Sequence, residues 1–234
     1  MLVQYLPRLL NKKIVLASAS PRRQELLRNI GLKFEVEVSS FDEKLPHDQF
    51  KSGAEYAMET ARHKALEVSE KVPYADLVIG ADTVVEHAGR ILEKPSDASE
   101  AEEVLKSLSG AMHQVHTGVV LVLQRQLTSV NSSGLSAGEG SRVSSTSVQL
   151  QEPLVISFVT TTSVTFDDLD EATVAAYVAS GEPFGKAGSY GIQGAAGSFV
   201  KGISGCYFNV MGFPLHDFSV ELVKLIRSGI LTIQ

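Results

Sequence analysis

Two arginines, Arg22 and Arg23, stand where a helix should begin. The segment KIVLASASPRRQELLRNIG predicts a strand that runs into a helix, with Ser20 as the N-cap, Pro21 as the first helical residue and Gly31 as the stop. Unpaired N–H groups and the helix macrodipole favour negative charge there, so each arginine costs about 0.3–1 kcal/mol of helix stability. A bound anion would offset this cost, because helix N-termini bind anions and arginine donors match phosphate oxygens. The alternative is that both arginines point to solvent.

Two carboxylates and two lysines are further candidates for chemistry. Asp82 follows the apolar run DLVIGA, which is typical of a strand buried on both faces. Ligands of open α/β sheets bind beyond the carboxyl ends of strands, so Asp82 is a candidate metal ligand or general base, or otherwise a turn residue. Glu43, in the polar loop FDEK, is a second such carboxylate or a surface charge. Lys64 lies at the edge of an alanine stripe at helical spacing, and Lys94 lies near a strand end. A lone lysine in such a place normally reaches to water, so only convergence with other groups would give either one a role.

The segment GEPFGKAGSYGIQGAAG, residues 181–197, is dense in glycine and contains Lys186. It is not a P-loop, because its spacing is one residue short and Ala187 stands where Ser or Thr should bind magnesium. Glycines at this density indicate a backbone that approaches a ligand closely. Gln193 offers both a donor and an acceptor, as reading one edge of a nucleobase requires.

Composition and spacing argue against several other classes. The formal net charge of -6 argues against a general nucleic-acid binder, and no apolar run approaches the ~20 residues that span a membrane. Cys206 is the single cysteine, so no intrachain disulfide forms, and a reducing, cytoplasmic location is expected. His113 and His116 lie three apart in a predicted strand, so they point to opposite faces and cannot easily share one metal ion. The opening MLVQYLPRLLNKK reads as an extension packed on the domain rather than a targeting segment.

Strands and helices alternate along the chain, which predicts an α/β protein in one domain, residues 1–234. Predicted strands are KFEVEV, half-buried by its alternation, then DLVIGA, a hairpin around Ala88-Gly89, His113–Leu123, EPLVISFVTTTSVTF and a short strand near SFVKGI. Predicted helices follow Ser20, carry the alanine stripe of residues 54–68, and cover SDASEAEEVLKSLSG, residues 168–180 and a segment from Pro214. A Ser/Gly-rich stretch at about 125–152 reads as a flexible insertion between paired strands.

The ordered set of motifs resembles the Maf family of nucleotide pyrophosphatases, from about Ile14 to Val223. The motifs are SASPRRQELL, ARHKA, GADTVV, ILEKP, HQVHTGV, VTTTSVTF, YVASGEP, KAGSYGIQG and NVMGFPL. The resemblance implies a twisted mixed β-sheet with flanking helices, in two lobes around a central cleft, of the Maf/inosine triphosphatase-like kind. It also implies hydrolysis of a nucleoside triphosphate between its α and β phosphates, a Mg²⁺ or Mn²⁺ ion, and a homodimer.

Site residues are carried over by motif. Asp82 matches the family's proposed proton acceptor and, with Glu43, its metal-binding carboxylates. Matching the polar and cationic lining of the triphosphate site are Ser18, Arg22, Arg23, Lys64, Lys94 and Lys186. GADT and YGIQG resemble the branch that acts on dTTP and UTP, in which positions matching Arg22, Thr83 and Gln193 are associated with substrate choice.

Three hypotheses remain open from the sequence. The first is a dTTP/UTP pyrophosphatase, and the second is the same reaction on other bases. The third is a nucleotide-binding regulator of cell growth or division with little turnover, although a pure binder would not need the carboxylates. The sequence departs from the family pattern at Gly185, where relatives often carry aspartate, at His63, where an acid is common, and in the longer insertion.

Overall fold

The computed structural model describes residues 1–124, 129–130, 147–148 and 152–233. Its strands are β1 (Ile14–Ala17), β2 (Glu35–Val36), β3 (Leu77–His87), β4 (Arg90–Leu92), β5 (Met112–Leu123), β6 (Ser129–Val130), β7 (Ser147–Val148), β8 (Leu154–Phe166) and β9 (Val200–Ser204). The α-helices are α1 (Leu6–Leu9), α2 (Pro21–Asn29), α3 (Gly53–Lys71), α4 (Ala98–Leu108), α5 (Glu171–Ala179), α6 (Tyr207–Val210) and α7 (Leu215–Arg227). Short 3₁₀ helices are η1 (Leu2–Gln4), η2 (His47–Gln49), η3 (Ala187–Ser189) and η4 (Ala195–Phe199).

Seven strands form one sheet in the order β2-β1-β3-β5-β8-β9, with β4 paired to the outer part of β3. The β2, β1 and β3 strands are parallel, and the remaining pairings of this sheet are antiparallel. This confirms the expected mixed sheet. β6 and β7 pair with each other inside the 125–152 insertion, most of which lies outside the described residues.

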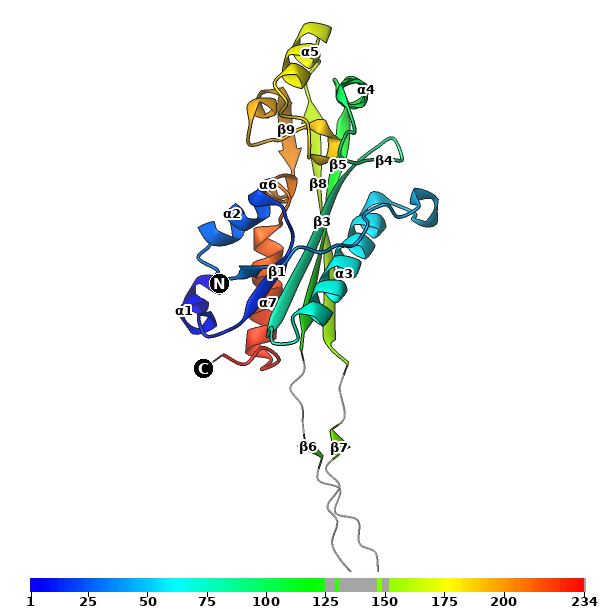
Figure 1. The fold of residues 1–234 in the computed structure, drawn as a ribbon. Coiled ribbons are helices and arrows are strands. Elements are labelled where there is room, and N and C mark those ends of the chain that lie inside the picture. Colours follow the sequence, from blue (N-terminus) through cyan, green and yellow to red (C-terminus); the bar gives the residue numbers. More distant parts are fainter. Residues whose placement is uncertain (125–128, 131–146, 149–151, 234) are drawn as a thin grey trace, which may run out of the picture.

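Alternate residues of the central strands face two helix layers (Figure 1). On one face, Leu16 and Ile79 share a core with Phe218 of α7 and residues of α2. On the other, Val78 packs with Ala61 of α3. This alternation is what the pleat of a strand covered on both faces requires.

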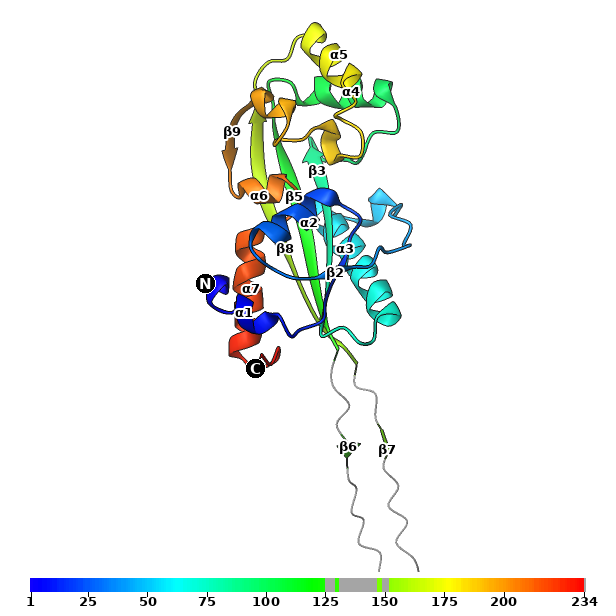
Figure 2. The ribbon, with the colours of Figure 1, turned by 60° about the vertical axis from the view of Figure 1, so that its left-hand side comes forward.

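The long strands β3, β5 and β8 carry the sheet beyond these layers into a second group of elements. Around their far ends lie α4, α5 and β9, which Figure 2 shows stacked above α2, α3 and α7. Phe166, Leu105 and Val178 belong to a separate apolar core there. Two lobes therefore share one sheet.

Helix α3 lies very close to the sheet, because two strand glycines face it. A Cβ on Gly118 would lie 2.5 Å from the carbonyl oxygen of Ala57, and one on Gly80 would lie 2.5 Å from that of Ala61. Only glycine therefore allows this helix–sheet spacing. The predicted alanine stripe on α3 is confirmed, since Ala57, Ala61 and Ala65 are fully buried.

We expect Gly118→Ala to lower the free energy of unfolding by about 1–3 kcal/mol, because its methyl group meets backbone that cannot rotate away. Gly202→Ala is the matched control, since a Cβ there has nothing within 4 Å. Denaturant unfolding of both variants checks this. Equal stability of the two would contradict the close α3–sheet packing.

For two of the predicted strands, the predicted first or last residues are wrong. KFEVEV yields only the two-residue β2, and both residues are exposed because β2 is the edge strand of the sheet. The strand through DLVIGA does not end before Asp82 but continues to His87, because its pairing with β5 runs on to Glu86. Asp82 therefore lies within a strand.

The two ends of the chain lie close together, beside α1 and α7 (Figure 2). Leu2 and Leu9 are buried in the core that includes α7, and Arg8 donates a 2.9 Å hydrogen bond to the carbonyl oxygen of Ile233. The packed N-terminal extension is thus confirmed. Within the described ranges, every helix is too short or too polar to cross a membrane.

Candidate functional site

The site opens where β1 stops and β3 continues. Ala17, the last residue of β1, pairs with Gly80, so Asp82 and Thr83 lie beyond the end of β1. A cavity of about 310 Å³ occupies this place between the lobes. All ten residues singled out in the sequence line it: Ser18, Arg22, Arg23, Glu43, Lys64, Asp82, Thr83, Lys94, Lys186 and Gln193.

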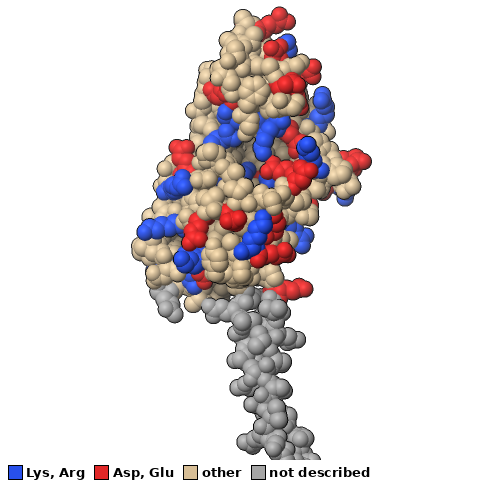
Figure 3. Space-filling model, in the orientation of Figure 1, with Lys and Arg blue, Asp and Glu red and all other residues tan. Residues whose placement is uncertain are grey.

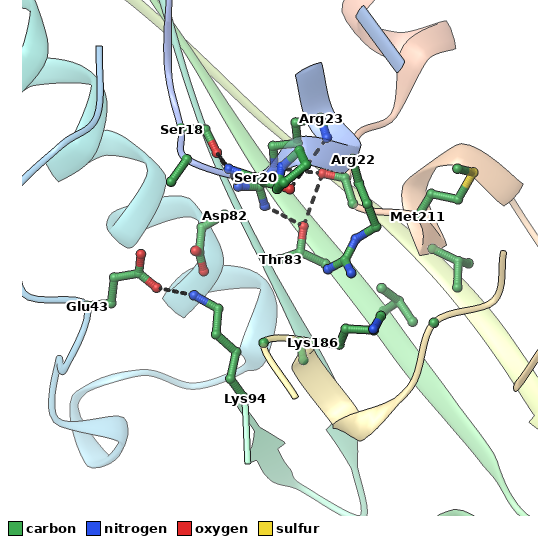
Figure 4. A pocket seen from close by; sticks show the side chains of 18 of the residues that line it. Ser18, Ser20, Arg22, Arg23, Glu43, Asp82, Thr83, Lys94, Lys186 and Met211 are labelled. Carbon is green, nitrogen blue, oxygen red and sulfur yellow. Dashed lines mark hydrogen bonds and ion pairs between the residues drawn. The ribbon is translucent and has the colours of Figure 1, made fainter. Parts of the chain in front are cut away.

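Helix α2 begins at the cavity with the predicted cap. The Ser20 hydroxyl accepts a hydrogen bond from the Arg23 backbone N–H, and Pro21 follows as the first helical residue. This cap fixes the first turn of α2, which carries both arginines into the cavity (Figure 4). The solvent-facing alternative is therefore wrong.

Arg23 is only 8% exposed, and each of its three side-chain nitrogens donates a hydrogen bond. Nη1 donates to Ser18 Oγ, Nη2 to Thr83 Oγ1 and Nε to the Gly212 carbonyl, each at 2.9 Å. The guanidinium is thus held rigidly at the cavity wall. Burial lowers the pKa of Arg22 from its ordinary value, and its side chain has no hydrogen bond or ion pair with any of the described residues. Its donors remain available to a ligand.

Lys64 joins the two carboxylates. Its Nζ lies 2.7 Å from Glu43 Oε1 and 2.7 Å from Asp82 Oδ1, while Lys94 Nζ lies 2.9 Å from Glu43 Oε2. Lys64 and Asp82 are 6% and 7% exposed, so the position at the edge of the alanine stripe turns Lys64 inward rather than to water. The carboxylates and lysines form one continuous ionic cluster.

The pKa values of the two carboxylates move in opposite directions. Burial acts to raise the pKa of Glu43, but Lys64 and Lys94 outweigh it and lower that pKa to about 2. Burial raises the pKa of Asp82 above its ordinary value, against the opposing effects of Lys64 and Arg23. Asp82 is therefore the stronger base of the two.

The cavity is cationic although the chain is acidic. Its lining holds five Lys and Arg side chains against two carboxylates, whereas the chain has a formal net charge of -6. Figure 3 shows Lys and Arg gathered with Asp and Glu around the hollow on this face. Such a local excess of positive charge suits a small, highly charged anion.

The glycine-rich segment forms the opposite wall, as its composition indicated. Gly188 has a φ of 66°, and a Cβ there would lie 2.5 Å from Val85 Cγ2. Glu182 braces the segment by accepting from the backbone N–H of Ala195 at 3.1 Å and from the Tyr177 hydroxyl at 3.0 Å. The Lys186 ammonium donates to the Glu182 carbonyl. These contacts place Gln193 at the cavity.

An apolar part of the lining was not singled out from the sequence. It comprises Val85, Val115, Tyr190, Val210 and Met211. These side chains offer an uncharged surface in the same cavity as the cations. In the sequence, such residues carry no signal that separates a ligand contact from the core.

The two strand histidines take separate partners, as their spacing predicted. His113 Nε2 lies 2.8 Å from the Tyr190 hydroxyl, and His116 Nδ1 lies 2.9 Å from Thr161 Oγ1. Burial lowers the pKa of His113 to about 4, so it is neutral at pH 7. In the described ranges, no three His, Cys, Asp or Glu side chains gather into a metal cage.

The fold and the cavity define an α/β protein whose cationic cavity, between two lobes, suits a small, highly charged anion. The family profile described as "Maf-like protein" matches residues 13–225, and the chain belongs to this family. The expected family membership is confirmed.

Three relatives have sequences similar to most of this chain. A human protein named "Probable bifunctional dTTP/UTP pyrophosphatase/methyltransferase protein" is 46% identical over 93% of this chain, which spans only 33% of that protein. A Clostridium perfringens protein named "dTTP/UTP pyrophosphatase" is 39% identical over 94% of this chain and 99% of its own length. A Bacillus cereus protein of the same name is 39% identical over 90% and 89%.

Proposed function

We propose that the chain hydrolyses dTTP and UTP to the nucleoside monophosphate and pyrophosphate. The observation that carries the proposal is the convergence of all ten candidate residues on one cavity. The names of relatives that match along nearly their whole length support the reaction and the substrates.

The cations bind and orient the triphosphate. Arg22 offers its guanidinium and its backbone N–H to phosphate oxygens, and Arg23 contributes a fixed positive charge beside it. Lys94 and Lys186 stabilise negative charge that develops on the bridging oxygen as it leaves. The cost of two arginines at a helix start is offset by the bound ligand.

Asp82 accepts the proton of the attacking water. The water oxygen bonds to the α-phosphorus, the bond from that phosphorus to the α,β-bridging oxygen breaks, and pyrophosphate leaves with the bonding electrons. Oδ1 of Asp82 accepts from Lys64, and in the described part of the chain Oδ2 has no hydrogen-bond partner. Oδ2 can therefore accept a hydrogen bond, and then the proton, from a water in the cavity that Asp82 lines.

A divalent cation fits the carboxylate pair. Glu43 and Asp82 supply hard oxygen ligands on one side of the cavity, and Mg²⁺ in phosphoryl-transfer sites is held by one or two carboxylates together with substrate phosphates. We assign Glu43 and Asp82 as the residues that would hold Mg²⁺ or Mn²⁺. Bound there, the ion would supply Lewis-acid neutralisation of phosphate charge.

Gln193 is proposed to read the base, because its amide complements the O4 and N3–H edge of uracil or thymine. We expect Gln193→Ala to lower the preference for UTP over CTP, in kcat/KM, by about tenfold through the lost hydrogen bonds. Ser198→Ala, in the neighbouring η4 turn and outside the cavity lining, is the control. Unchanged preference in Gln193→Ala would remove this residue from base recognition.

Pyrophosphate release from a panel of nucleoside triphosphates, with Mg²⁺ or Mn²⁺, tests the function. Selective turnover of dTTP and UTP supports the proposal. Turnover of other bases instead would assign the same reaction to different substrates. Tight binding of dTTP or UTP without turnover would favour the nucleotide-binding regulator.

The homodimer, the cytoplasmic location and the single-domain reading of residues 1–234 stay predictions. Sedimentation of the purified chain, with and without nucleotide, tests the oligomeric state.

A further inference from the structure

One buried hydroxyl, outside the cavity lining, contacts two segments that carry the ionic cluster. Tyr56 lies on α3, and its oxygen is 2.6 Å from the backbone carbonyl oxygen of Glu43 and 2.5 Å from Glu93 Oε1. Glu93 directly precedes Lys94, whose Nζ contacts Glu43 Oε2 at 2.9 Å. The hydroxyl thus touches the main chain of Glu43 and the residue next to its lysine partner.

The Tyr56 ring is itself held firmly. It is 1% exposed and makes edge-on contacts with His47 and Phe50, at centroid distances of 4.9 and 5.3 Å. Leu45 packs against the same small core. Burial and the Glu93 carboxylate raise the pKa of Tyr56, so the hydroxyl keeps its proton and donates it to either oxygen.

Glu43 needs such support because residues 37–46 contain no helix or strand. The first part of this loop is attached to α3 elsewhere: the hydroxyls of Ser39 and Ser40 donate to the Glu67 carboxylate. Phe41 also stacks on His63, with centroids 4.5 Å apart, which gives this departure from the family pattern a structural role. These contacts all precede Glu43. At Glu43 and beyond, the Tyr56 hydroxyl is a polar anchor between the loop and α3.

We propose that Tyr56 is a positioning residue for Glu43. Through its hydroxyl it fixes the Glu43 backbone relative to Lys94 and Lys64, and so sets where the carboxylate lies in the cavity. The consequence for catalysis rests on the proposed pyrophosphatase function. A misplacement of about 1 Å in such a site costs up to about 100-fold in rate.

Tyr56→Phe tests this, because it removes the hydroxyl and keeps the ring. With dTTP and saturating Mg²⁺, we expect kcat to fall about 10- to 100-fold while KM changes less than about threefold. Tyr74→Phe is the control: its hydroxyl also contacts a glutamate, Glu35, but outside the cavity lining, and its kcat should equal that of the wild type.

Hydrogen exchange provides a readout that does not depend on turnover. The Leu45 amide donates to the same Glu43 carbonyl, at 3.1 Å, and also interacts with the Tyr56 hydroxyl, so its exchange reports on this junction. We expect its exchange in Tyr56→Phe to be about five- to tenfold faster, with α3 unchanged. Wild-type exchange at Leu45, or faster exchange along the whole of α3, would overturn the inference. If the wild type itself releases no pyrophosphate, the proposed function fails, and the exchange comparison still decides the role of Tyr56.

Discussion

Asp82→Asn is expected to lower pyrophosphate release by about 10²–10⁴-fold, the usual contribution of a positioned general base. Asparagine has nearly the same shape, but it accepts no proton and offers a metal one weak oxygen ligand. The large effect follows because Asp82 is the strand carboxylate that faces the cavity, with its pKa raised by burial. Steady-state rates with dTTP and UTP, for the variant beside the wild type, measure it.

The fold should survive this substitution. Lys64 keeps Glu43 as its partner at 2.7 Å, and burial already disfavours the charged form of Asp82. We expect the melting temperature to change by less than about 4 °C, equivalent to about 1 kcal/mol. Nucleotide binding without turnover in a folded variant completes the test. Wild-type turnover by Asp82→Asn would exclude Asp82 as the proton acceptor.

Lys64→Met is expected to have the second large effect, on stability as well as activity. The change removes the cation between Glu43 and Asp82 and leaves Asp82, 7% exposed, as a buried charge facing a second carboxylate. Breaking a buried pair in this way costs about 3–5 kcal/mol of unfolding free energy at pH 7. Denaturant unfolding checks this, with Lys71→Met on the same helix as the control. The exposed Lys71 pairs with Glu67 on the surface, where an ion pair contributes about 0–1 kcal/mol.

The pH dependence of that loss has a definite sign. In the wild type the folded-state pKa of Glu43 is about 2, below its unfolded value of about 4.3, so its contribution is present above pH 4.3 and is lost as the pH falls toward 2. Without Lys64, protonation of Glu43 and Asp82 stabilises the folded protein instead, because it removes the repulsion between the two charges. The deficit of Lys64→Met relative to the wild type should therefore shrink between pH 7 and pH 4. A constant deficit would show that lost packing, rather than charge, causes it.

Local physical rules were sufficient to predict the first turn of α2 and the place of Lys64 on its helix. The Ser20-Pro21 start was readable because capping is decided within a few residues, and Ser20 does cap α2. Counting 100° per residue placed Lys64 at the edge of the alanine stripe, from which it turns inward. The resemblance to the family added the prediction that residues from distant segments line one site, which their spacing in the sequence alone could not show.

Other features depend on contacts between distant segments. Arg23 is held by the carbonyl of Gly212, 189 positions away, and by Thr83, whose hydroxyl was expected only to influence substrate choice. The prediction that Asp82 follows the end of a strand was wrong for the same reason. The strand continues because β5 pairs with it, and the run DLVIGA does not reveal that pairing. The polar anchor at Tyr56 was missed because a tyrosine on a buried helix face is indistinguishable from ordinary core.

The proximity of the two chain ends bears on how this protein can be altered experimentally. Arg8 and Ile233 are hydrogen-bonded to each other, whereas the cavity lining begins at Ala17 and ends at Gly212. An affinity tag or fluorescent reporter fused at either end would thus be attached to a segment that does not line the cavity. A short peptide could also connect the ends into a circular chain without stretching α1 or α7. Such ring closure would restrict the unfolded chain and leave the chemistry untouched.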